Sequence, residues 1–154
     1  MWQLTNEHVV ELRNAISNSI NFQVNSKLLL ERKADIICKC YKKLEIYPEM
    51  IQNLVTILKS KEGTPAEIVK RKQFAMYNFE VLSEYHLSQD LLVENSNEFI
   101  GLFQDSLVDE NVEIKVASLK AITSFLSSID EEEVVLKYKQ LADKLLNVVI
   151  EVMK

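Results

Sequence analysis

A two-helix unit recurs along the chain, and this recurrence limits the fold more than any other feature. Its clearest copy pairs the apolar stripe of 95–107 with that of 110–129, and an unpaired helical segment follows at about 134–154. Short and long amphipathic helices alternate with a period of roughly 40 residues, which is typical of an α-solenoid. Such hairpins cannot bury a core singly and must stack. We therefore expect an all-α superhelix of about seven helices.

The spacing of the long helices supports this repeat. They are expected to begin at Ser26, Thr64 and Asp109, at intervals of 38 and 45 residues. Because the final helix lacks a partner, we expect the chain to be a fragment of a longer solenoid. The whole of 1–154 forms one segment, with repeats and a final half repeat at these approximate positions: 5–45, 47–86, 88–130 and 131–154.

Backbone-breaking residues are scarce and stand where helices are expected to end or begin. The chain has two glycines and two prolines, and 47% of its residues are hydrophobic. Gly63 is expected to end a helix, and Thr64, Pro65 and Glu67 have the spacing of a capping box with proline at the first helical position. Asp109 is expected to cap the last long helix of a complete repeat. A fold rich in β-strands would need many more turn residues.

Composition excludes several classes of function. The net charge of −5 and the pI near 5.2 argue against nucleic acid as the main partner and suit basic protein segments instead. The sequence contains no run of 18 apolar residues, which a membrane-spanning helix would need. Cys38 and Cys40 point to different faces of one helix, and His8 and His86 do not supply zinc-ligand spacing. No catalytic constellation, cofactor motif or metal site is present, so we expect a binding protein that is not an enzyme.

The stretch 109–122 resembles the second helix of a HEAT repeat. It has a loop acid at Asp109, an aliphatic-basic pair at Ile114–Lys115, a small residue at Ser118 and another aliphatic residue at Ile122. This resemblance implies an armadillo-like helical superhelix.

Three further segments, Phe74–Glu80, Ala117–Ala121 and Tyr138–Leu141, resemble the N-terminal third of the importin-beta superfamily, of the importin-5 or karyopherin beta-3 type. The resemblance implies a segment of a nuclear import receptor, which binds cargo nuclear-localisation segments, Ran-GTP and FG nucleoporins. Protein transport between the cytoplasm and the nucleus would follow. A HEAT or armadillo scaffold, or a trafficking adaptor without Ran dependence, is the alternative.

Six residues are candidates for partner binding, and each has a structural alternative. Lys70 and Arg71 could contact an acidic partner or form a solvated first turn, and Tyr77 could lie on a recognition strip or pack between repeats. Phe99 and Phe103 could border a groove for FG repeats, as the resemblance implies, or fill the core.

Lys120, in the resembling segment Ala117–Ala121, is the sixth candidate. The last helix has more apolar surface than one partner covers, so an isolated chain is expected to dimerise, as an artefact, through Val134–Val152.

Overall fold

The computed structural model of the chain describes residues 5–20, 26–44, 47–84 and 93–153. Over these residues the backbone forms eight α-helices and one 3-10 helix, with no strand. The all-α prediction is therefore confirmed. The helices are α1 (Asn6–Ile20), α2 (Lys27–Leu44), α3 (Tyr47–Lys59), α4 (Pro65–Glu84), α6 (Ser96–Leu107), α7 (Val112–Ser127), α8 (Glu132–Lys137), η1 (Lys139–Leu141) and α9 (Ala142–Val152).

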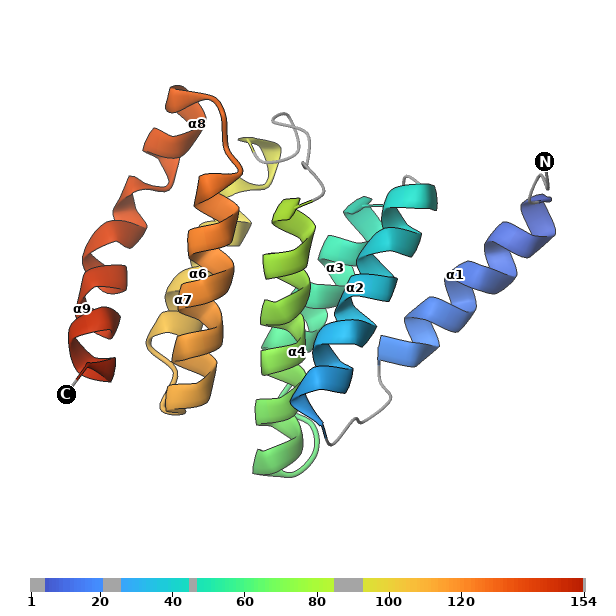
Figure 1. Cartoon of the computed structure of the whole chain (residues 1–154), viewed down its shortest axis with the longest axis horizontal. Helices are drawn as coiled ribbons and strands as arrows, with labels where there is room; N and C mark the ends of the chain where they lie inside the picture. The colour runs from blue at the N-terminus through green and yellow to red at the C-terminus, as the bar shows by residue number, and fades with distance from the viewer. Residues whose placement is uncertain (1–4, 21–25, 45–46, 85–92, 154) are drawn as a thin grey trace.

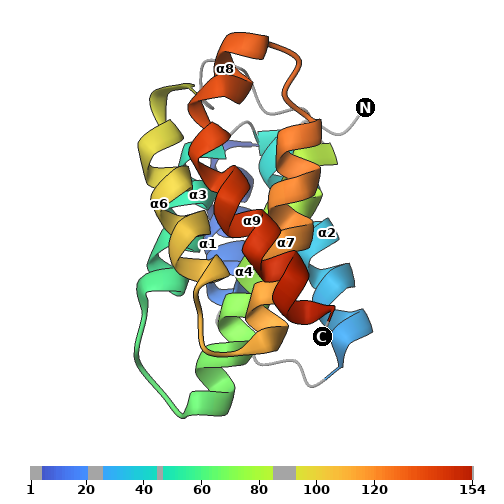
Figure 2. The same cartoon turned by 90° about the vertical axis from the view of Figure 1, so that its left-hand side faces the viewer.

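The helices stack into an open row two layers deep. Helices α2, α4 and α7 lie side by side in one layer, and α3 and α6 form the second layer behind them (Figures 1 and 2). Helix α9 stands at one end of the row and α1 at the other, where it tilts away from its neighbours. This solenoid-like arrangement agrees with the predicted fold class. No described helix is both long enough and apolar enough to cross a membrane.

Helix α4 lies in the middle of the row and is covered on several sides. Six consecutive residues, Phe74–Phe79, are buried, although a helix with a single neighbour would bury only one stripe. Helices α2 and α7 flank α4, and α3 packs behind it. Helix α4 therefore packs on more than one side, as a helix in the middle of a stack must.

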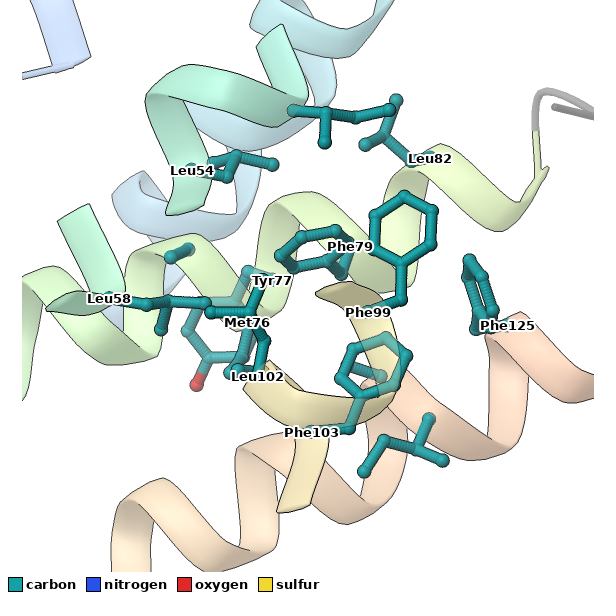
Figure 3. Packing of buried hydrophobic residues seen from close by; sticks show 14 of the residues in the cluster. Leu54, Leu58, Met76, Tyr77, Phe79, Leu82, Phe99, Leu102, Phe103 and Phe125 are labelled. Carbon is teal, nitrogen blue, oxygen red and sulfur yellow. The ribbon is translucent and has the colours of Figure 1, made fainter. Parts of the chain in front are cut away.

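Aromatic side chains join the second half of the row. Phe79 of α4 packs edge-to-face on both rings of α6, with centroids 5.8 Å from Phe99 and 5.5 Å from Phe103. Phe125 of α7 packs on the same two rings at 5.4 and 5.2 Å, and Tyr138 continues the chain at 5.4 Å from Phe125. Figure 3 shows the phenylalanine rings converging between α4, α6 and α7. Edge-to-face geometry adds to the hydrophobic gain of burying such rings.

The capping box at the start of α4 is confirmed. The backbone N–H of Thr64 donates to the Glu67 carboxylate at 2.7 Å, and the Glu67 N–H donates to the Thr64 hydroxyl at 3.4 Å. Gly63 before it has a φ of +95°, a conformation that side chains disfavour. A Cβ at Gly63 would also come within 2.8 Å of the Glu67 carboxylate.

The predicted cap of α7 is wrong by two residues. The N-cap is Asn111, whose side-chain oxygen accepts hydrogen bonds from the N–H groups of Glu113 and Ile114. Asp109 is not available for this role, because its carboxylate pairs with Lys72 at 2.6 Å and accepts the N–H of Asn111. Asp109 thus ties the α6–α7 turn to α4.

The predicted continuous helix at 134–154 is broken into α8, η1 and α9. At the break, the N–H of Leu141 donates to the carbonyl of Tyr138 at 2.9 Å, which is 3-10 geometry. This tighter turn aligns side chains three residues apart, so Tyr138 and Leu141 both face the core, where both are buried. The segment Ser88–Glu94, for which the sequence leaves either an extra turn of helix or an ordered loop open, lies mainly outside the described residues.

Replacing Phe103 by alanine is expected to lower the free energy of unfolding by about 3–5 kcal/mol, because the vacated space lies among three other rings. Leu146→Ala on the exposed side of α9 is the matched control and should change it by about 0.5 kcal/mol or less. Urea denaturation followed by circular dichroism measures both. Equal effects of the two substitutions would contradict the packing described here.

Candidate functional site

Phe99 and Phe103 are core residues. Both have an exposed fraction of 0%, and their rings are enclosed by Phe79 and Phe125. The hypothesis that they border a groove for FG repeats is therefore wrong, and the packing alternative holds. Their helical spacing could not distinguish the two interpretations, since a core stripe and a groove wall have the same period.

The basic residues at the start of α4 serve the structure in part. The Arg71 guanidinium donates to the Glu62 carbonyl across the α3–α4 turn, and Lys72 pairs with Asp109. Lys70 is half-buried, and Lys120 is exposed near the middle of α7. The structure does not gather Lys70, Arg71 and Lys120 into one site.

Tyr77 of α4 lies in the layer formed by α2, α4 and α7, close to acidic residues of all three helices. It is mainly buried, and burial raises the pKa of its phenol above the ordinary value. The carboxylates of Glu31 on α2, Glu80 on α4 and Glu113 on α7 raise this pKa further. Gln73 bridges α4 and α7 by donating to Glu113 at 2.9 Å. Tyr77 therefore lies in an acidic environment that three successive helices supply.

An apolar groove lies between α1 and α2. Its volume is about 520 Å³. Leu12, Ala15 and Ile16 line it from α1, and the α2 side is lined mainly by hydrocarbon. Its lining residues on α2 are Leu29, Arg32, Lys33, Ile36, Ile37 and Cys40.

The groove walls expose large apolar side chains to water. Leu29 has an exposed fraction of 56% and Ile36 of 61%, whereas Ile16 and Ile37 at the same groove are buried. Helix α1 is held at its other side by an ion pair between Arg13 and Glu49 of α3, at 2.5 Å. The groove is therefore an apolar surface that the described residues leave uncovered.

The sequence contained a signal for this groove. Leu29, Ile36 and Cys40 form a second stripe on α2, at spacings of seven and four residues, beside the core stripe that includes Ala34 and Tyr41. None of the three residues in this second stripe is among the six partner-binding candidates predicted from the sequence. A second apolar stripe on a helix with charged neighbours is the pattern of a helix that packs twice.

A smaller hollow of about 310 Å³, lined by both apolar and polar side chains, lies beside the hairpin turns. Its lining includes Lys59, Lys61, Asp105 and the ion pair of Lys72 with Asp109. No three His, Cys, Asp or Glu side chains of the described residues gather as a metal site.

Comparison with known proteins gives one distant similarity. The chain is 25% identical over 134 residues to Glucose N-acetyltransferase 1 of Saccharomyces cerevisiae. The match covers 77% of this chain but only 27% of the yeast protein, so the chain spans about a quarter of that relative's length. The chain matches no protein-family model, and no solved structure matches it.

These comparisons correct two expectations from the sequence. The resemblance to importin-beta receptors is contradicted, because no family model matches and the similarity found is to a yeast transferase. The expectation that the chain is not an enzyme is contradicted by the same relative, whose name is that of an enzyme. The first expectation rested on short segments whose apolar spacing many helical repeats share, and the second rested on the lack of a recognisable catalytic motif in the sequence.

The pKa of Tyr77 tests whether α2, α4 and α7 lie side by side as described. Replacing Glu113 by glutamine removes one negative charge and is expected to lower the pKa of Tyr77 toward its ordinary value. Because the folded state holds this proton more tightly, Tyr77 should also lower the free energy of unfolding as the pH rises above about 10. Ultraviolet titration, with Tyr77→Phe to identify the signal, measures the shift. Glu132→Gln on α8 is the control, and an equal shift there would contradict the assignment.

Proposed function

We propose that this chain is a protein-binding segment of stacked helical hairpins, which holds a partner segment in the groove between α1 and α2. The observation that carries the proposal is the row of uncovered apolar side chains along α2, with Leu29 and Ile36 more than half exposed. Contiguous exposed apolar surface of this kind marks a site of interaction. The role is that of a helical scaffold or adaptor.

The shape of the groove favours a helix as the bound element. Its α2 wall extends from Leu29 to Cys40, which corresponds to about 16 Å or three helical turns. An amphipathic helix that lays its apolar face between two helices is a recurrent mode of peptide recognition. The groove is open along its length, whereas sites for small molecules are usually enclosed.

A pair of neighbouring leucines provides a matched test. Leu28 and Leu29 have exposed fractions of 61% and 56%, but only Leu29 lines the groove. The probe is a labelled synthetic helix with leucine on one face and glutamine on the others. Leu29→Gln is expected to weaken its binding about tenfold, whereas Leu28→Gln should change it less than about twofold.

Fluorescence anisotropy measures this binding, and circular dichroism checks that both variants fold. Equal weakening by Leu28→Gln and Leu29→Gln would mean that the probe binds elsewhere. The absence of binding to the unaltered chain would also contradict the proposed function.

A second candidate is the activity in the name of the yeast relative, that of a glucose N-acetyltransferase. Its support is the 25% identity to that protein, together with the smaller hollow that Asp105 and Lys72 help to line. Mass spectrometry of an amino-sugar acceptor, incubated with the chain and an activated acetyl donor, would detect the product. Asp105→Asn should reduce product formation, because the substitution removes a carboxylate from the lining of the hollow. The variant is expected to fold, since Asp105 is exposed and takes no part in the Lys72–Asp109 ion pair. Absence of product from the unaltered chain would remove this candidate.

A further inference from the structure

Two parallel stripes on α2 carry information about the partner. The apolar stripe of the groove consists of Leu29, Ile36 and Cys40. Three residues further along the chain, Arg32, Lys39 and Lys43 repeat the same spacings of seven and four. Because residues at these spacings share a helical face, a basic row runs beside the apolar row along the whole groove.

The basic row faces water. Arg32 and Lys43 are exposed, and Lys39 is exposed although it pairs with Asp35 of the preceding turn at 2.7 Å. Lys33 differs from these three, because its ammonium lies 4.9 Å from the centre of the Phe74 ring and its pKa is lowered by burial. The row that can meet a partner is thus Arg32, Lys39 and Lys43.

The charge of α2 is opposite to that of the whole chain. Helix α2 contains six basic and two acidic residues and so carries a net charge of +4, within a chain of net charge −5. The α1 wall of the groove is uncharged, since its lining residues are Leu12, Ala15, Ile16 and Ser19. The groove therefore has one basic edge and one neutral wall.

We propose that the groove binds an amphipathic helix with a row of Asp or Glu residues beside its apolar face. This inference rests on the proposed function and adds the chemistry of the partner. The apolar face of such a helix would cover Leu29 and Ile36. Its acidic row would lie along Arg32, Lys39 and Lys43, and the one-sided charge would fix the orientation of the helix in the groove.

Three labelled helical peptides test the proposal. They share one leucine face and differ only in the row beside it, which is glutamate, glutamine or lysine. The unaltered chain is expected to bind the glutamate peptide roughly five- to tenfold more tightly than the lysine peptide. This preference should shrink as the salt concentration rises, because the contacts are exposed to solvent.

Substitutions on the chain provide the reciprocal test. Arg32→Glu with Lys43→Glu should reverse the preference toward the lysine peptide. Lys137→Gln with Lys139→Gln removes two exposed charges from α8 and η1, at the opposite end of the stack of helices, and should leave the preference unchanged. Should the reversed variant fail to fold, the peptide series on the unaltered chain still decides.

The outcomes separate the two proposals. Equal binding of all three peptides, with sensitivity to Leu29→Gln, would overturn the acidic partner and leave the proposed function intact. Binding of no peptide, or binding that Leu29→Gln does not affect, would overturn the proposed function itself. A salt-sensitive preference for glutamate supports the acidic helix.

Discussion

The burial of α4 on several sides is the constraint on which the rest of the structure depends. Because all of Phe74–Phe79 is buried, α4 needs neighbours on both flanks and behind it. Phe79 then connects α4 to the rings of α6, and these connect through Phe125 to Tyr138. On the opposite flank of α4, the thiol of Cys38 on α2 donates a hydrogen bond to the carbonyl of buried Asn78 on α4. The row is thus organised outward from one helix, and contacts weaken toward its ends.

This gradient explains where the candidate site lies. Among the described residues no aromatic ring of α1 joins the ring contacts, and this helix is held by buried Ile16 and by the Arg13–Glu49 ion pair. A partly exposed ion pair contributes little to stability. Helix α1 therefore tilts away from its neighbours (Figure 1). The apolar side chains of Leu29 and Ile36 on α2 remain exposed at the groove. Binding of a partner there would complete the packing that α4 obtains from its own chain.

Much of the fold could be predicted from local signals, whereas the site could not. The spacing of apolar residues predicted that the chain is helical, and the capping box at Thr64 predicted where α4 begins. The cap of α7 was misplaced because the pairing of Asp109 with Lys72 is a tertiary contact, and the break at Tyr138 carries no glycine or proline. Phe99 and the stripe of Leu29 look alike in sequence. Only the neighbouring helices decide that one is core and the other a groove wall.

Hydrogen exchange by mass spectrometry tests the central claim most directly. The account predicts that the amides of α4 and α7 exchange slowest, through opening of the whole fold, and that those of α1 exchange much faster. Protection of α1 equal to that of α4 would contradict the account, because α1 would then be packed as tightly as the middle of the row and no groove would be open.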